Sequence, residues 1–204
     1  MISLTKKTNK LLLQLREVIQ PAREGVIFIH INKTGGSSIG KALGMPLEHR
    51  TAVEKIAKLG QKKWDSCFSF AVVRNPWDKV VSHYHYRVQT NQTGLADAQI
   101  EFKQWVKLCY QEQNPAYYDK PKMFQPQTDW ISDQQGNIKV NHICKFETLN
   151  ADFATLCKTI NKTAELPHIK TSNREKYSEY YDNETAEIVR KWFQEDIDLF
   201  IYKF

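Results

Sequence analysis

The sequence has little glycine and proline, few cysteines and no long apolar run. Eight glycines and seven prolines in 204 residues exclude collagen-like, low-complexity and disordered chains. Apolar runs such as Val26–Ile29 are far shorter than the ~18 residues needed to span a bilayer. The four cysteines are scattered without a C-x-x-C pair, so we expect buried free thiols rather than a zinc site. These features predict one folded domain, with room for a short appendage, and no membrane span.

Positive charge is concentrated at the start of the chain. The net charge is +6, and residues 1–23 carry five basic side chains against one glutamate. Leucines at helical spacing predict a basic amphipathic helix over residues 1–24, ahead of a domain over 25–204. Such a helix is compatible with a peripheral contact with a membrane surface. We expect no nucleic-acid partner. The apolar stretch after the lysines is too short for a signal peptide, which predicts a cytoplasmic location.

Short apolar runs alternate with helical patterns along the chain. The runs at 25–31, Phe68–Val73 and His142–Phe146 are typical of strands covered on both faces. A helical pattern follows each of the first two, and Pro76 suits the first position of the second helix. The alternation predicts an α/β fold, a single domain with a central parallel β-sheet flanked by helices. Its ligand site is expected at the carboxyl ends of the strands.

Three local patterns lie outside this alternation. The segment Thr51-Ala-Val-Glu54 is a capping box, and it predicts a short helix that ends at Gly60. Residues 111–128 are rich in polar residues and predict a long irregular loop of functional importance. Trp130–Ile131 and Ile138–Val140 flank a polar turn and predict a hairpin.

The first predicted strand and helix are joined by Asn32-Lys-Thr-Gly-Gly-Ser-Ser38. Paired glycines let backbone N–H groups converge on an anion, and the helix start adds about half a positive charge. Lys33 supplies a cation, and the threonine and serines supply hydroxyl donors. The loop is therefore predicted to bind phosphate or sulfate.

The same loop resembles the phosphate loop of nucleotide triphosphatases without its metal ligand. Gly35-Gly-Ser-Ser-Ile-Gly40-Lys41 is followed by Ala42, where a triphosphatase needs Ser or Thr to hold Mg²⁺. The second strand likewise runs into Arg74 instead of the Asp that contacts magnesium. Both observations favour a phosphate-bearing cosubstrate that is handled without metal. Arg74 can hold a phosphate in bidentate fashion, and Ser82 on the following helix can donate a hydroxyl to the same group.

Two motifs together resemble a known enzyme family. His30-Ile-Asn-Lys-Thr-Gly-Gly-Ser-Ser38 and Phe70-Ala-Val-Val-Arg-Asn-Pro-Trp-Asp-Lys-Val-Val-Ser-His-Tyr84 are similar to those of sulfotransferases that use 3′-phosphoadenosine 5′-phosphosulfate (PAPS). The likeness is to the carbohydrate sulfotransferase-like group, sulfotransferase family 2, and it covers nearly the whole chain. It implies a sulfotransferase fold related to the P-loop nucleotide hydrolases, PAPS as the donor cosubstrate and no metal.

The resemblance also implies roles for individual residues. The first loop would bind the 5′-phosphosulfate, and Arg74 and Ser82 would bind the 3′-phosphate. The loop residues concerned are Lys33, Thr34, Gly35, Gly36, Ser37 and Ser38. The family usually has Pro where this chain has Asn32, which would leave the loop less rigid. A late segment over residues 168–177 is similar to one that closes over the nucleotide, with Lys170 and Arg174 as its cations.

Sulfuryl transfer needs positive charge at the bridging oxygen and a base for the acceptor proton. Lys33 fits the first role by its position in the loop. Histidine is the commonest base, and His49 lies between the two phosphate motifs, where related polysaccharide sulfotransferases have a catalytic histidine. His49 is the predicted base, with Glu48 and Asp129 as alternatives.

The acceptor and two other functions stay open at this point. The resemblance favours a hydroxyl on a saccharide, while the aromatic content of 12% suits a phenol or a lipid headgroup equally well. A P-loop kinase-like phosphotransferase is the alternative enzyme, and Mg²⁺-dependent ATP turnover would support it. The alternative to an enzyme is a catalytically inactive protein that binds the nucleotide. The sequence does not predict the oligomeric state.

Overall fold

The computed structural model describes residues 25–167 and 175–204, which group into two compact units. The first unit comprises residues 25–31, 35–73 and 130–167, and the second comprises 32–34, 74–129 and 175–204. The predicted helix over residues 1–24 lies outside the described residues, and so do Lys170 and Arg174. The predicted boundary between an N-terminal helix and a single domain therefore stays a prediction. Within the described part, no helix is long and apolar enough to cross a membrane.

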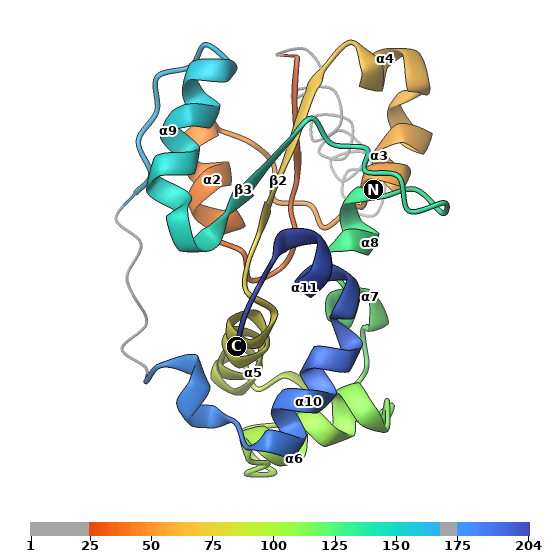
Figure 1. Ribbon diagram of the computed structural model, residues 1–204, viewed down its shortest axis with the longest axis vertical. Coiled ribbons are helices and arrows are strands. Elements are labelled where there is room, and N and C mark those ends of the chain that lie inside the picture. The colour runs from red at the N-terminus through yellow and green to blue at the C-terminus, as the bar shows by residue number, and fades with distance from the viewer. Residues whose placement is uncertain (1–24, 168–174) are drawn as a thin grey trace, which may run out of the picture. The chain divides into compact units, whose positions relative to one another are not determined.

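The first unit is built on a three-stranded sheet flanked by helices (Figure 1). Its elements are β1 (Val26–Ile29), α2 (Gly36–Leu43), α3 (Ala52–Leu59), α4 (Gln61–Asp65), β2 (Phe68–Val73), β3 (His142–Lys145), η3 (Phe146–Thr148) and α9 (Leu149–Thr159). The strands are ordered β1-β2-β3 and both pairs are parallel, with Val26 opposite Phe68 and Phe70 opposite His142. The predicted α/β class and its parallel sheet are confirmed.

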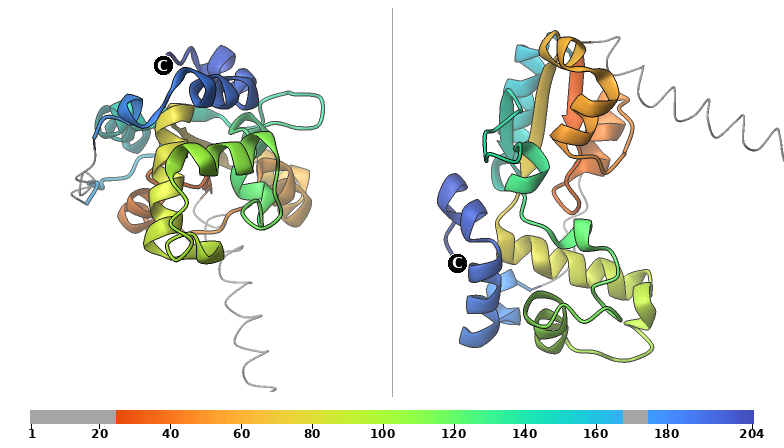
Figure 2. Two further views of the ribbon diagram at one scale, coloured as in Figure 1. Left: turned by 90° about the horizontal axis from the view of Figure 1, so that it is seen from below. Right: turned by 90° about the vertical axis from the view of Figure 1, so that its right-hand side faces the viewer.

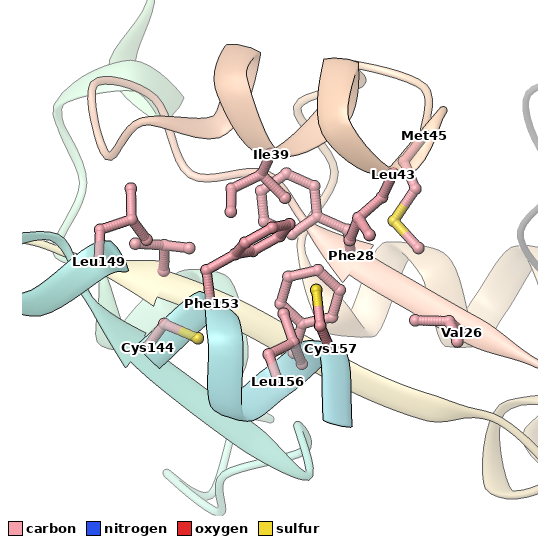
Figure 3. Close-up of a cluster of buried hydrophobic side chains, with 12 residues drawn as sticks. Val26, Phe28, Ile39, Leu43, Met45, Cys144, Leu149, Phe153, Leu156 and Cys157 are labelled. Carbon is pink, nitrogen blue, oxygen red and sulfur yellow. The ribbon is translucent and has the colours of Figure 1, made fainter. Parts of the chain in front are cut away.

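The two faces of the sheet are covered by different helices. Helices α2 and α9 pack on one face, where Ile39 and Phe153 meet the ring of Phe28 in one buried cluster (Figure 3). Helices α3 and α4 lie on the other side of the sheet (Figure 1). Burial on both faces explains why the strands read as continuous apolar runs. The carboxyl ends of neighbouring β1 and β2 lead directly into the two predicted anion-binding segments.

Local signals in the first unit are confirmed except for the hairpin. The Thr51 hydroxyl accepts a hydrogen bond from the Glu54 amide, and the Glu54 carboxylate accepts one from the Thr51 amide, as the capping box predicts. The hairpin prediction is wrong, because Trp130 and Ile131 end the short helix α8 (Thr128–Ile131). What remains of it is the turn and a single antiparallel bridge between Ser132 and Ile138.

In the second unit, the regular elements among the described residues are all helices. Its elements are α5 (Pro76–Gln89), η1 (Gln92–Gly94), α6 (Phe102–Val106), η2 (Lys107–Gln111), α7 (Pro121–Phe124), η4 (Tyr177–Tyr180), α10 (Asn183–Trp192) and α11 (Gln194–Phe200). Helix α10 lies beside α5 (Figures 1 and 2), and both contribute to an aromatic core around Trp105 and Phe124. Pro76 occupies the first turn of α5 as predicted. The prediction of an irregular loop over 111–128 is partly wrong, because α7 lies within it.

All four cysteines are free and buried, as predicted. Cys109 belongs to the core of the second unit, and Cys144 and Cys157 belong to that of the first. Burial raises the pKa of Cys109 and of Cys144 to about 12. Both thiols therefore stay protonated and act as small apolar side chains.

The buried face of α5 carries three basic side chains at spacing four. Lys79, His83 and Arg87 are each less than 5% exposed. Arg87 donates to the Asp119 carboxylate at 2.7 Å, so its charge is paired. Burial lowers the pKa of His83 well below its ordinary value, and the charges of Lys79 and Arg87 lower it further. His83 is therefore a neutral core residue rather than a candidate base.

The buried charge of Lys79 lowers the stability of the folded chain at neutral pH. Burial lowers its pKa to about 8, against the attraction of Asp196. Between pH 8 and 10.5 the unfolded chain binds more protons at this lysine than the folded chain does, so the free energy of unfolding rises with pH there. Below pH 8 the full net cost of burying the charge is present, about 3 kcal/mol with the attraction of Asp196 already included.

We therefore expect Lys79→Met to stabilise the protein at pH 7 by about 1–3 kcal/mol, because the neutral side chain keeps the volume without the buried charge. Urea unfolding at pH 7 and pH 10 measures this, and the gain should shrink at the higher pH. Lys41→Met, at an exposed lysine in the last turn of α2, is the control and should change neither value. A gain that does not depend on pH would contradict the shifted pKa.

Candidate functional site

In the loop after β1, neighbouring side chains lie close to the backbone of two glycines. Gly35 precedes α2 with φ 84°, a left-handed conformation that favours glycine. A Cβ on Gly35 would lie 3.1 Å from Leu149, and one on Gly36 would overlap the ring of His30. The glycine pair is therefore required by packing as well as by backbone conformation.

The first turn of α2 carries backbone N–H groups for which a helix provides no acceptor of its own. Gly35 has no side chain to cap the helix, and the first turn carries no acidic residue. The amides of Ser38 and Ile39 donate to the carbonyl of Gly35. The amides of Gly36 and Ser37 lie in the first turn, where an α-helix provides no internal acceptor. Ser37 is exposed and Ser38 is half-buried. This helix start can therefore bind an anion through amides and hydroxyls.

Asn32, at the start of the loop, is bound by its side chain to a distant segment of the second unit. Its side-chain amide donates to the carbonyl of Met123 at 3.0 Å, and the residue is only 6% exposed. This hydrogen bond joins the start of the loop to a segment about ninety residues away. Thr34, two residues further on, is fully buried.

Lys33 and Arg74 meet in the second unit. The Arg74 guanidinium donates through Nη1 to the carbonyl of Lys33 at 2.9 Å, and through Nε and Nη2 to Asp78. The ammonium group of Lys33 lies 4.2 Å from the centre of the Tyr86 ring, a cation–π contact. Lys33 has φ 64°, a left-handed conformation that is uncommon outside glycine.

Helix α5 brings three of the predicted residues together. Asp78, Ser82 and Tyr86 follow at spacing four and so lie on one face of the helix. Asp78 binds Arg74 and Tyr86 contacts Lys33, which places half-buried Ser82 between those two partners along the same face. The sequence analysis did not identify Asp78 or Tyr86. Their spacing from Ser82 is a signal by which they could have been found.

His49 has a defined tautomer in the first unit. Its Nδ1 lies 3.0 Å from the carbonyl oxygen of His30, which can only accept a hydrogen bond. Nδ1 therefore carries the proton, and Nε2 presents a lone pair from an exposed side chain. The imidazole stacks on that of His30 at 4.4 Å and meets the edge of Trp130 at 6.0 Å. These contacts fix the ring while its basic nitrogen stays available.

The surroundings of His49 separate it from the other candidate bases. Burial lowers the pKa of His30 to about 4, with the charges of His49 and Lys55 adding to the effect, so His30 is neutral. Burial acts to raise the pKa of Glu48, but Lys55 and Arg50 outweigh it and lower that pKa. Glu48 is thus a carboxylate held by two cations.

Asp129 keeps its place as an alternative base. Burial raises its pKa, and the nearby charges of Glu195 and Asp196 raise it further. The side chain is exposed at the start of α8. A carboxylate with a raised pKa in an exposed position is chemically able to accept a proton.

Comparison with known proteins points to one family. The family model described as the sulfotransferase family matches residues 16–203, nearly the whole chain. No curated protein and no solved structure matches the chain. The matched range contains the glycine loop, His49 and α5 with its polar face.

Proposed function

The chain belongs to the sulfotransferase family, and from that premise we propose that it transfers a sulfuryl group from PAPS to a hydroxyl group on a carbohydrate. One observation carries the proposal. Within the second unit, Lys33 contacts Tyr86 and Arg74 pairs with Asp78, so two cations lie on either side of Ser82 along one face of α5. Two cations and a hydroxyl along one helix face suit a ligand that carries phosphate groups.

In the proposed complex, different residues bind the two ends of the donor. The amides of Gly36 and Ser37, together with the hydroxyls of Thr34, Ser37 and Ser38, would hold the 5′-phosphosulfate. Arg74 and Ser82 would hold the 3′-phosphate, with the guanidinium exchanging part of its contact with Asp78 for the phosphate. The buried pairing of Arg74 keeps its charge oriented before the ligand arrives.

Lys33 and His49 would act on opposite ends of the transferred group. The reaction breaks the bond between sulfur and the 5′-phosphate oxygen and forms one between sulfur and the acceptor oxygen. Lys33 would stabilise the charge that develops on the departing phosphate oxygen. His49 would take the acceptor proton on Nε2, because its Nδ1 proton is already committed to the carbonyl of His30.

We propose that this reaction needs no metal ion. Ala42 stands where a triphosphatase has its magnesium-binding hydroxyl, and β2 leads into Arg74 rather than an aspartate. In the proposed reaction, the charges of Lys33 and Arg74 would take the electrostatic role that Mg²⁺ has in kinases.

Calorimetry with adenosine 3′,5′-bisphosphate tests the donor site. We expect binding that is unchanged by a chelator and about tenfold or more tighter than that of adenosine 5′-monophosphate, because the 3′-phosphate adds charge-assisted hydrogen bonds. Arg74→Met should abolish this preference. Arg190→Met, at an exposed arginine paired with Glu187, is the matched control and should retain it.

Two results would contradict the proposal. Binding that collapses in chelator, or a preference for ATP with Mg²⁺, would favour a phosphotransferase. The acceptor is tested separately, by supplying labelled PAPS with saccharides, phenols and lipid headgroups. Transfer to a phenol or lipid but to no saccharide would retain the sulfotransferase and overturn the carbohydrate acceptor.

A further inference from the structure

Gln127 is paired with the peptide group of Arg74 in both directions. The Arg74 amide donates to Gln127 Oε1 at 2.9 Å, and Gln127 Nε2 donates to the Arg74 carbonyl at 2.8 Å. Gln127 is fully buried. Arg74 is the first residue after β2, so the glutamine side chain supplies a hydrogen-bonded partner at the point where the strand has ended. This contact fixes the backbone from which the guanidinium extends.

Asp196 in α11 holds Gln127 in turn. Its carboxylate accepts hydrogen bonds from the Gln127 amide at 2.8 Å, from Gln127 Nε2 at 3.0 Å and from the Thr128 amide at 2.8 Å. Asp196 is also fully buried. Burial raises its pKa, while the hydrogen bonds from Gln127 and Thr128 act in the opposite direction. The glutamine amide is thereby fixed on both sides, and its oxygen and nitrogen cannot exchange places without loss of hydrogen bonds.

The same chain of contacts continues to the loop. The Arg74 guanidinium donates to the carbonyl of Lys33, whose backbone has positive φ. Hydrogen bonds thus run from Asp196 through Gln127 and Arg74 to Lys33, across segments far apart in sequence. A shift of the Arg74 backbone would move its guanidinium and release the carbonyl of Lys33 at the same time.

We propose that Gln127 is a positioning residue for donor binding, anchored by Asp196 and acting through Arg74. This inference rests on the proposed function, because Arg74 and Lys33 are assigned to the donor nucleotide there. It assigns Gln127 no contact with the nucleotide. Its effect should therefore depend on the presence of the Arg74 side chain.

The test compares Gln127→Met with a matched variant in the same unit. Methionine keeps the volume of glutamine and removes both hydrogen bonds to Arg74. Thr185→Val is the control, because Thr185 is equally buried and valine removes the hydroxyl that donates to the Asp182 carboxylate and accepts from the Asp182 amide at the start of α10. We expect Gln127→Met to raise the Kd of adenosine 3′,5′-bisphosphate about tenfold, as for the loss of one oriented ionic contact. Thr185→Val should leave that Kd unchanged although both variants lower Tm.

A double-mutant cycle separates positioning from general stability. In an Arg74→Met background, Gln127→Met should raise the Kd no further, because the side chain it positions is absent. Asp196→Asn is the milder second variant if Gln127→Met does not fold, and it should raise the Kd by a smaller factor. An unchanged Kd in the variant that folds, or full additivity with Arg74→Met, would overturn the inference. If the wild-type protein itself fails to bind the bisphosphate, it is the proposed function that fails.

Discussion

We expect His49→Ala to lower kcat by about 10²–10⁴-fold, the usual contribution of a general base, while the Kd of adenosine 3′,5′-bisphosphate stays at the wild-type value. The separation follows from the roles proposed here. His49 acts on the acceptor proton through Nε2, whereas the nucleotide is bound by the loop and by Arg74. Steady-state kinetics with one good acceptor and calorimetry with the product nucleotide measure the two quantities.

His49→Asn distinguishes the base from a purely structural histidine. The asparagine amide can still donate to the carbonyl of His30, as Nδ1 of His49 does at 3.0 Å, but it has no basic nitrogen. Both variants should therefore lose kcat alike. His142→Gln is the matched control, at a half-buried histidine in β3, and it should retain wild-type kcat. Near-normal turnover in His49→Asn would transfer the role to another group. Asp129→Asn would then be the next substitution, ahead of Glu48→Gln, because Glu48 is already paired with two cations.

The elements predicted correctly from sequence are those whose signals are local. The run Phe68–Val73 forms β2 with the predicted bounds, because a strand covered on both faces shows as an unbroken apolar segment. The capping box at Thr51 and the proline at the start of α5 work through neighbours within four residues. Such features need no knowledge of the tertiary structure.

The errors occur where the deciding partner is distant. Trp130 and Ile131 read as a strand beside a turn, yet they belong to α8, whose first amide donates to Asp196. That carboxylate is 68 residues away and leaves no trace in the local pattern. The predicted turn itself is present, with Asn137 donating its amide to the Asp133 carboxylate.

In the candidate site, too, the features with local signals were predicted and those that depend on distant partners were not. Lys33 and Arg74 could be selected from sequence because the loops that carry them follow predicted strands. Their hydrogen bond, and the pairing of Arg74 with Gln127, join segments that only the folded chain brings together. The roles of the individual residues stay predictions, and the largest of the remaining effects concerns Lys33.

Replacing Lys33 by methionine should lower kcat/KM by about 10²–10³-fold, the loss expected when one donor to a developing anion is removed. Methionine preserves the length and keeps the same positive φ, so the change isolates the charge. Because Lys33 would contact the leaving phosphate in both ground and transition states, kcat should fall and the donor KM should rise. The factor in kcat should be the same for every acceptor, in contrast to His49→Ala, whose cost depends on the acidity of the acceptor hydroxyl.

Lys41→Met is the control for the charge of Lys33, since it removes an exposed lysine in the last turn of α2. It changes the net charge by the same amount and should leave both kcat and the donor KM unaltered. Lys33→Arg should recover part of the activity, because a cation returns but its planar group cannot reproduce the contact of the ammonium with Tyr86. If Lys33→Met reduced turnover only for some acceptors, the lysine would be acting on the acceptor and not on the departing phosphate. The assignment of the two ends of the transferred group would then have to be reversed.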